Sequence, residues 1–302
     1  MTNKTKGFIF GAVSAASYGM NPLFALPLYK EGLSVDNVLL MRYTLASAVM
    51  GLLMIKGGES FKVRKSEILP LIVMGVLYAV SSLFLFKGYK VMDAGVAATI
   101  FFAYPVMVAL INGAFFHEHI SRMVWGCMLT ALCGIALLGQ TAGGGTLSIS
   151  GTIFVLLSAL AYVIYMVGVK ESRLKSMSSS KLNFYALSLG AIIFLFRVHP
   201  LQGGISLPGT PFGWSMLAGL ALVPTVLSLL TLTRSIRYIG STLTAVLGAF
   251  EPITALFFGV MLFGEQLTWR NMLGIVLVIS SVMAIVCEKQ IVRYAQRYLH
   301  SL

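Results

Sequence analysis

The stretch "GAFEPITALFFG", from Gly248 to Gly259, places an acid and a proline inside an otherwise apolar segment. The pattern predicts a helix over residues 238–263, so Glu251 lies about 20 Å along it at a rise of ~1.5 Å per residue. That depth is close to the middle of a bilayer whose hydrocarbon core is about 30 Å thick. An ionisable residue there is costly in hydrocarbon, and we expect it to face the bundle interior or a water-filled cavity.

The composition of the whole chain is that of a membrane protein. Apolar residues make up 58% of the sequence and charged residues 11%, whereas about a quarter of the residues of a soluble domain are charged. Apolar runs of about 20 residues, the length that crosses a bilayer, use nearly the whole chain. We predict an all-α polytopic membrane protein with ten transmembrane helices, at residues 7–28, 36–55, 67–86, 93–116, 123–140, 150–169, 181–198, 212–233, 238–263 and 270–287.

The net charge of +12 is spread over the connections between the apolar runs, so it indicates topology and not a nucleic-acid surface. Lys and Arg are retained in cytoplasmic loops. With both termini in the cytoplasm, sixteen of the 22 basic residues fall on the cytoplasmic side. The six on the outer side are Lys30, Arg42, Lys87, Lys90, Arg197 and Arg270.

The two halves of the sequence resemble one another. Residues 7–18, "GFIFGAVSAASY", align with residues 151–162, "GTIFVLLSALAY", at an offset of 144. At an offset of 147, a second set aligns, namely Lys87, Lys90, Pro105 and Glu118 with Arg234, Arg237, Pro252 and Glu265. Each copy holds five predicted helices, an odd number, so the second copy must enter the membrane in the opposite orientation. We therefore expect two inverted repeats, residues 1–145 and 146–302, with a substrate site near the midplane.

The basic residues of the loops favour the same inversion. The connection after the second helix carries four, and its counterpart after the seventh carries one, Arg197. The connection after the first helix carries Lys30 alone, and its counterpart after the sixth carries four. The positive bias therefore changes sides between the copies, as inverted repeats require.

Two segments with similar endings carry a family resemblance. "YPVMVALINGAFFHEHIS" starts at Tyr104, and "EPITALFFGVMLFGEQLT" starts at Glu251. Both resemble the end of the EamA repeat of the drug/metabolite transporter superfamily, and the resemblance covers almost the whole chain. It implies a secondary transporter in the bacterial cytoplasmic (inner) membrane, since members export amino acids and other metabolites or take up choline. Members often have Trp-Gly in the first helix, where this chain has Tyr18-Gly19.

Glu251 has two interpretations. Pro252 cannot donate to the carbonyl of Gly248, so it frees an acceptor and bends the helix. A neutral Glu251 could donate to that acceptor as a structural plug. Alternatively, burial favours the neutral form enough for the carboxyl group to take up and release protons during function.

Other polar and aromatic residues at similar depth are candidates for lining the same cavity. Small and polar residues in membrane helices also serve helix packing, but a phenol in the bilayer needs a partner and offers a ring face to a cation. The candidates are Tyr18, Asn21, Tyr78, Ser82, Tyr104, Tyr162, Tyr165, Thr225 and Thr244. No basic residue is expected at the depth of Glu251, so a substrate carboxylate would depend on hydroxyls, on Asn21 or on exposed helix ends.

Several residues are candidates for helix breaks or gates. Pro22, Pro105 and Pro252 are expected to interrupt their helices. Lys87 and Arg234 end the third and eighth helices, where they form gate ion pairs or extend to the headgroups. The "HEH" of residues 117–119 lacks HExxH spacing, and no metal site is expected. Gly126, Thr130 and Gly134 mediate either dimerisation or internal packing.

The leading hypothesis is secondary active transport of a small amino-acid-like or amine metabolite by alternating access, coupled to protons. The resemblance to the EamA repeat implies the direction, export, because nothing in the residues themselves fixes it. The alternative is uptake of a quaternary amine such as choline, which requires an ionised Glu251. An intramembrane enzyme is not expected, because GxSxG and HExxH are absent, and a channel would not need a central acid in an inverted repeat. No cofactor is expected. The expected partners are the solute, protons and lipid, with a monomeric or weakly dimeric chain.

Overall fold

A computed structural model describes residues 2–116, 122–137, 148–201 and 204–299, and within these ranges the chain is helical without β-strands. The helices follow the apolar runs closely. Their bounds are α1 Asn3–Gly19, α2 Asn21–Lys30, α3 Val35–Lys56, α4 Lys65–Val91, α5 Ala94–Phe101, α6 Tyr104–Phe116, α7 Arg122–Leu137, α8 Ile149–Glu171, η1 Arg173–Ser176, α9 Ser179–Leu201, α10 Pro211–Ala221, η2 Leu222–Leu227, α11 Ser228–Leu247, α12 Phe250–Phe263 and α13 Trp269–Leu299.

Short polar side chains determine where several helices begin. The hydroxyl of Ser34 accepts a hydrogen bond from the backbone N–H of Asn37 at the start of α3, and Ser148 and Thr210 cap α8 and α10 in the same way. These bonds satisfy donors that the first helical turn leaves without a partner. The end of α12 is set by Gly264, whose φ of 68° is a left-handed conformation that glycine adopts without strain.

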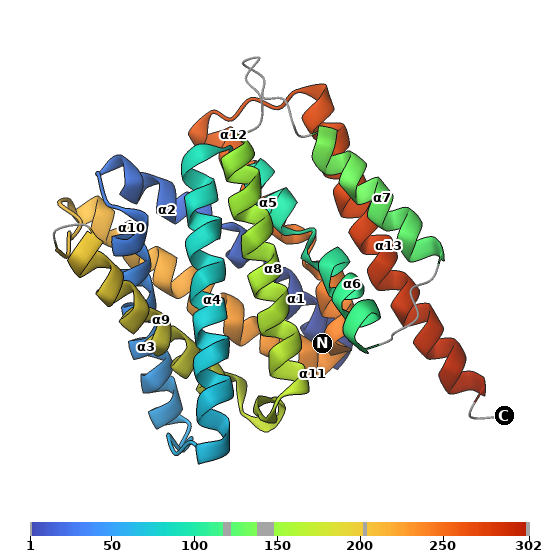
Figure 1. The fold of residues 1–302 in the computed structure, drawn as a ribbon, viewed down its shortest axis with the longest axis horizontal. Helices are drawn as coiled ribbons and strands as arrows, with labels where there is room; N and C mark the ends of the chain where they lie inside the picture. Colours follow the sequence, from blue (N-terminus) through green and yellow to red (C-terminus); the bar gives the residue numbers. More distant parts are fainter. Residues whose placement is uncertain (1, 117–121, 138–147, 202–203, 300–302) are drawn as a thin grey trace.

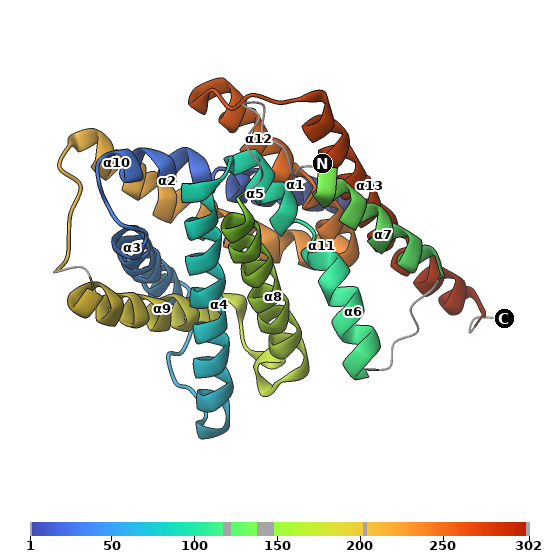
Figure 2. The same ribbon diagram turned by 45° about the horizontal axis from the view of Figure 1, so that its top comes forward.

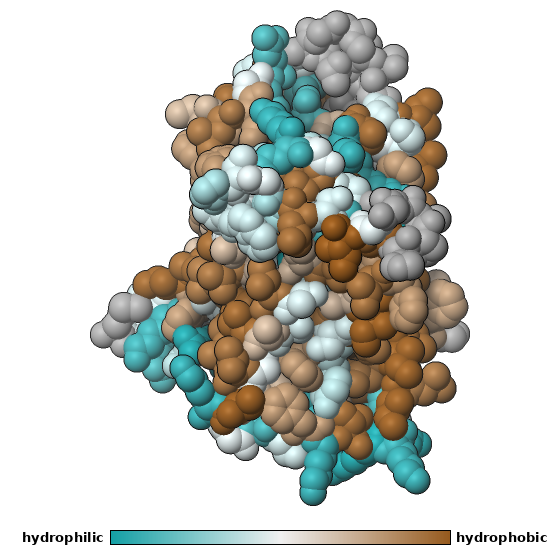
Figure 3. Space-filling model, turned by 90° about the vertical axis from the view of Figure 1, so that its left-hand side faces the viewer, coloured by the Kyte–Doolittle hydropathy of each residue, from teal (hydrophilic) through white to brown (hydrophobic). Residues whose placement is uncertain are grey.

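Seven helical segments of the described chain are long and apolar enough to cross a membrane, and shorter apolar helices accompany them. Apolar side chains cover much of the surface, with hydrophilic residues gathered mainly toward its two ends (Figure 3). The seven segments are Asn3–Lys30, Val35–Lys56, Lys65–Val91, Ala94–Phe115, Ile149–Val169, Ser179–Val198 and Pro211–Ile239, and the shorter helices are Trp125–Leu137, Phe250–Phe263 and Trp269–Ala284. The predicted all-α polytopic membrane protein is confirmed, whereas the count of ten crossings stays a prediction.

Two predicted helix boundaries are wrong. The sequence predicts a connection at residues 234–237, but α11 runs without interruption from Ser228 to Leu247. Polar residues such as Arg234 and Arg237 are good helix formers, so a loss of hydropathy does not end the helix. For the same reason α13 extends to Leu299, beyond the predicted end at residue 287.

The closest helix pairs join segments that are far apart in the sequence. They are α1 with α11, α4 with α8, α3 with α9, and α7 with α13. Figure 1 shows α4 beside α8 near the centre and α7 along α13 at one edge. Figure 2 shows α2 beside α10 at another edge. Each of these pairs combines a helix from residues 1–145 with one from 146–302, so the two halves of the chain are interleaved.

Two of these pairs have matching contacts. In the α4–α8 pair, Ser158 Oγ donates to Ser81 O at 2.7 Å. In the α1–α11 pair, Ser14 Oγ donates to Ser228 O at 2.9 Å. The residues are related by the offsets found in the sequence, 144 from Ser14 to Ser158 and 147 from Ser81 to Ser228. The internal similarity of the sequence therefore corresponds to two similar helix contacts.

Helices α7 and α13 pack closely because α7 has a glycine at their contact. A Cβ atom on Gly134 would lie 2.8 Å from the carbonyl oxygen of Gly274. Gly126 has open space around it, and the Thr130 hydroxyl donates to its own helix at Gly126 O. Gly134 therefore contributes to packing within the chain, which is one of the two roles that the sequence analysis considered for Gly126, Thr130 and Gly134.

Candidate substrate-binding site

Helix breaks occur at all three prolines for which the sequence predicts them. Helix α1 ends at Gly19 and α2 begins at Asn21, beside Pro22. Helix α5 ends at Phe101 and α6 begins at Tyr104, and α11 ends at Leu247 before α12 begins at Phe250. Each proline lies in the first turn of the helix that follows, where its missing N–H costs nothing. The breaks set polar residues at helix starts inside the fold, as in discontinuous transporter helices.

Glu251 is the second residue of α12 and is 8% exposed. The start of a helix carries a partial positive charge that stabilises a carboxylate, whereas removal from water favours the protonated acid. Its own backbone N–H donates to Gly248 O at 2.9 Å. The carbonyl that a plug would have to satisfy thus has a backbone partner, and within the described residues the Glu251 side chain makes no hydrogen bond or ion pair.

Gly19 brings the end of α1 against the start of α12. A Cβ atom at Gly19 would lie 2.3 Å from the carbonyl oxygen of Glu251 and 2.9 Å from Cβ of Thr254. Because the first neighbour is backbone, it cannot move aside as a flexible side chain would. The glycine therefore permits the close approach that sets Tyr18 beside the acid.

The structure brings the five candidate tyrosines together in one cluster. Ring centroids lie 5.3 Å apart for Tyr78 and Tyr165, 5.3 Å for Tyr104 and Tyr162, and 6.1 Å for Tyr162 and Tyr165. Tyr18 joins through Phe101, at 6.4 Å. The Glu251 carboxyl group interacts electrostatically with Tyr18, Tyr104 and Tyr162. The five tyrosines and Phe101 form one group, the tyrosine cluster, and Glu251 lies beside it.

The four other polar candidates are all buried, but their placements differ. Asn21 Nδ2 donates to Tyr18 O at 2.8 Å, while Asn21 Oδ1 has no partner among the described residues. Ser82 Oγ accepts from Tyr43 at 2.6 Å. Thr244 bonds instead to Ser235, which donates to Gly7 O near the far end of α1. Asn21 and Ser82 therefore adjoin the tyrosine cluster, and Thr244 takes part in helix packing.

Arg42 is a buried charge that the sequence analysis assigned to the outer side. It lies in α3 and is 2% exposed. Its Nε donates to Thr225 Oγ1 at 2.8 Å, and its guanidinium lies 5.0 Å from the centroid of the Phe86 ring. Thr225 belongs to η2, a π-helical stretch that contains Pro224, and such stretches often mark functional sites. The position of Arg42 seven residues inside an apolar helix was the signal that could have identified it.

Lys87 and Arg234 contact aromatic rings. Lys87 Nζ lies 5.6 Å from the centroid of Phe154, and the Arg234 guanidinium lies 5.5 Å from that of Phe10. Neither residue forms an ion pair within the described part of the chain. An ion pair does occur between Arg197 Nε and Asp36 Oδ1, at 2.6 Å. The gate ion pairs considered for Lys87 and Arg234 are therefore replaced by matching cation–π contacts.

Glu265 joins the end of α12 to the start of α5. Its carboxylate oxygens accept hydrogen bonds from the backbone N–H groups of Ala94, at 2.6 Å, and Gly95, at 3.2 Å. Burial raises the pKa of Glu265, the two N–H groups act in the opposite direction, and the charge of Asp93 raises it further. Burial also raises the pKa of Asp93. This contact lies on the side predicted to be outside, and the repeat counterpart, Glu118, falls outside the described residues.

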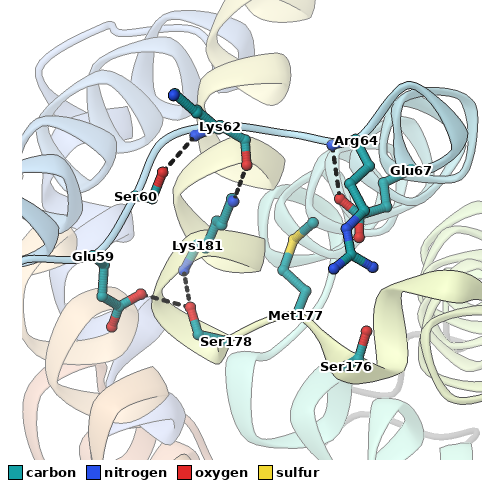
Figure 4. Close-up of a pocket in the computed structure, with 9 residues that line it drawn as sticks. All are labelled: Glu59, Ser60, Lys62, Arg64, Glu67, Ser176, Met177, Ser178 and Lys181. Atoms are coloured by element: carbon teal, nitrogen blue, oxygen red, sulfur yellow. Dashed lines mark hydrogen bonds between the residues drawn. The ribbon is translucent and has the colours of Figure 1, made fainter.

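A polar surface pocket of about 560 Å³ lies on the side predicted to be cytoplasmic. Figure 4 shows Lys181 and Ser178 turned toward the connection between α3 and α4, where Ser178 Oγ donates to Glu59 Oε2 at 2.5 Å and Lys181 Nζ donates to Lys62 O. Glu67 borders this pocket eleven residues before Tyr78 in α4, about 16 Å at the rise of a helix. The pocket is therefore separate from the tyrosine cluster.

The described residues contain no group of three or more His, Cys, Asp or Glu side chains placed to hold a metal ion. The "HEH" segment, residues 117–119, falls outside the part of the chain that the structure describes. Cys127, Cys133 and Cys287 take part in no disulfide within the described residues.

Comparisons with known proteins give one consistent result. The model of the EamA-like transporter family matches residues 5–140 and again residues 149–287. Two similar proteins of Bacillus subtilis (strain 168) are the "Uncharacterized transporter YxxF", 21% identical over 93% of this chain and 87% of its own, and the "Uncharacterized transporter YcbK", 24% identical over 89% and 88%. A solved structure described as "Crystal structure of protein" superposes with a TM-score of 0.67 at 16% identity, over 93% of this chain and 96% of that one.

The solved structure shares the fold, and the relatives are named as transporters. A family model that matches twice, over nearly the whole sequence, agrees with the resemblance of the segments after Tyr104 and Glu251. The protein is a multi-pass membrane transporter for a small molecule, and the chain belongs to the EamA-like transporter family of the drug/metabolite transporter superfamily.

Proposed function

We propose that this protein exports a small amino-acid-like or amine metabolite across the bacterial cytoplasmic membrane by alternating access, coupled to protons. The observation that carries the proposal is the Glu251 carboxyl group, which is buried at a helix start beside the tyrosine cluster with no side-chain partner in the described chain. Intramembrane acids in such positions are typical of substrate and proton sites.

The chemistry of the tyrosine cluster favours an amine. A carboxylate attracts an ammonium group, and the ring faces of Tyr18, Tyr104 and Tyr162 add cation–π attraction, each worth about 1–2 kcal/mol when water is excluded. Asn21 Oδ1, a buried acceptor without a partner among the described residues, offers a hydrogen bond to the same group. Together these groups suit a protonated amine of modest size.

Alternating access is supported by the interleaved halves of the chain. In our proposal residues 1–145 and 146–302 are inverted five-helix repeats, with both termini in the cytoplasm and the site between the repeats. The matching Ser14–Ser228 and Ser158–Ser81 contacts are the kind of paired interface on which one unit can rock against the other. The chain works as a monomer or weak homodimer, since the site is formed by one copy.

Uptake of a quaternary amine such as choline is the second candidate, and the ring faces are the feature that favours it. The two candidates differ in what Glu251 does. An exporter that exchanges protons needs the carboxyl group to change its protonation state, whereas a carrier of a permanent cation needs it ionised throughout.

Purified protein in proteoliposomes tests the proposal. A thermal-shift screen of amino acids, amines and choline first identifies a ligand, because a ligand that binds the folded state stabilises it. Efflux of that ligand is then measured with and without a pH gradient, in wild-type protein and in Glu251→Gln. We expect the wild-type rate to follow the pH gradient and the variant to lose this dependence. Equal, pH-independent rates in both proteins would refute the proposed role of Glu251, and flux of choline inward would favour the second candidate.

A further inference from the structure

Arg42 provides the site with a second buried charge, of opposite sign to Glu251. The side chain is 2% exposed and lies in α3, a helix that does not contribute to the predicted cavity. Taking a guanidinium out of water is costly unless hydrogen bonds and an opposite charge compensate. Within the described residues Arg42 has no ion-pair partner, so the compensation from the protein is incomplete.

The contacts of Arg42 fix its orientation and leave its terminal nitrogens without acceptors. Nε donates to Thr225 Oγ1, and Phe86 supports the face of the guanidinium. Thr225 in turn donates to Leu220 O at 3.0 Å, which fixes the acceptor in place. The remaining donors of the guanidinium, on its two terminal nitrogens, contact no acceptor in the described chain. A planar pair of N–H donors of this kind matches the two oxygens of a carboxylate.

Arg42 and Glu251 share a surrounding set of tyrosines. Tyr18 and Tyr89 each lie within electrostatic range of both charges. Tyr43, next to Arg42 in the sequence, has its ring 5.9 Å from that of Tyr78, which belongs to the tyrosine cluster. The positive and the negative group therefore both lie near the same group of tyrosines.

We propose that Arg42 is a substrate-binding residue that holds the carboxylate of the transported solute. This inference rests on the proposed function, in which Glu251 attracts the amine of the same solute. A solute with an amine and a carboxylate leaves the site electrically balanced, whereas a simple amine or a choline-like cation would be repelled by Arg42. The rings of the surrounding tyrosines suit an amino acid with an apolar or aromatic side chain.

The test uses derivatives that lack one charged group at a time. The twenty common L-amino acids are titrated against the purified full-length protein, and the strongest binder is then compared with its methyl ester, its decarboxylated amine and its deaminated acid. In wild-type protein the parent should bind roughly 10- to 100-fold more tightly than the ester or the amine, since a hydrogen-bonded charge pair is lost. Arg42→Gln should weaken the parent by the same factor, whereas the decarboxylated amine should bind as tightly as before or more tightly, because the repulsion by Arg42 is removed.

Matched variants separate binding from structure. Arg173→Gln removes an exposed arginine and should change none of these affinities. Arg42→Lys keeps the charge without the planar donor pair, so it should give an intermediate loss for the parent alone. Equal weakening of the parent and the amine in Arg42→Gln would assign Arg42 to structure and overturn the proposal, as would an ester that binds wild-type protein as tightly as the parent. The comparison of the ester with the parent uses only wild-type protein, so it does not depend on whether a variant folds. If no amino acid and no amine binds at all, the proposed function itself fails.

Discussion

The α4–α8 pair and the α1–α11 pair are built alike, yet the helices around them deliver different residues to the site. Both pairs have a buried serine bond and a cation over a phenylalanine ring. At an offset of 147, however, Tyr104 corresponds to Glu251. Tyr78 likewise corresponds to Thr225, which binds Arg42. Packing is thus retained in both copies, while the chemistry of the site differs between them.

The backbone differs between the copies in the same place. Helix α4 is continuous through Tyr78, but its counterpart contains the π-helical stretch η2 around Thr225. Pro224 has no N–H to donate, and a π-helical turn accommodates that loss. The second copy therefore has both the irregular backbone and the acid. In the proposed site each copy therefore contributes one charge, Glu251 from the second copy and Arg42 from the first.

The largest expected effect tests the difference between Glu251 and Tyr104. Glu251→Gln should reduce transport in proteoliposomes to background, roughly 100-fold or more, because the ammonium partner and the proton acceptor are both lost. Tyr104→Phe should reduce it less than tenfold, since the ring face remains. Similar losses in the two variants would mean that the two copies contribute equally, contrary to the comparison above.

The next largest effect concerns the close approach of α1 to Glu251. Gly19→Ala adds a Cβ that would lie 2.3 Å from a backbone oxygen, so we expect a loss of ~1–3 kcal/mol in the free energy of unfolding and impaired transport. Gly126→Ala is the matched control, because nothing lies within 4 Å of the added atom. Thermal unfolding in detergent measures both. A Gly19→Ala protein as stable and active as the control would show that the two helices can separate freely.

A pH effect is expected at the contact between Glu265 and α5. Burial raises the pKa of Glu265 in this conformation, so a proton binds more tightly here than on a solvent-exposed carboxyl group. The contact is therefore favoured at low pH and is weakened as the pH rises from the ordinary carboxyl range, about 4.3, through the raised pKa. The same sign holds for Asp93, whose pKa is also raised.

Labelling of Met92→Cys, in a protein whose Cys127, Cys133 and Cys287 are replaced by serine, can follow this contact. The rate at which the introduced cysteine is labelled should increase with pH more steeply than expected from ionisation of the thiol alone. Labelling of the unfolded protein gives that expected increase. Glu265→Gln should flatten most of this increase and leave the part due to Asp93. A pH profile that is identical in the two proteins would exclude Glu265 as its source.

The smallest effects test the similarity of the two helix pairs. Ser14→Ala and Ser158→Ala each remove one buried donor, and interhelical hydrogen bonds in membrane proteins contribute about 0.6 kcal/mol on average. We expect the two variants to lose similar amounts of unfolding free energy in chemical denaturation. A loss several times larger in one of them would show that the pairs are not equivalent.

Much of the fold could be predicted because the bilayer restricts it. Long apolar runs must form helices, since backbone groups in lipid have no other partners, and prolines mark where those helices break, as at Pro22 and Pro252. The five tyrosines could also be identified as candidates, because the sequence predicts them at a depth similar to that of Glu251 and a phenol offers both a hydroxyl and a ring face. The uninterrupted α11 could not be predicted from hydropathy, because the intrinsic helix preference of residues such as Arg234 does not depend on polarity.

The sequence by itself determined most of the helices, the internal duplication and the break beside Glu251, because these depend on hydropathy, on sequence offsets and on proline. Only the tertiary structure decided that Arg42 lies buried against Thr225 and that Thr244 bonds to Ser235. The reason is that a long side chain can end far from its own Cα, and its surroundings are provided by helices nearly two hundred residues away. Helix rotation and packing, which a single sequence leaves undetermined, select the partners of each polar group.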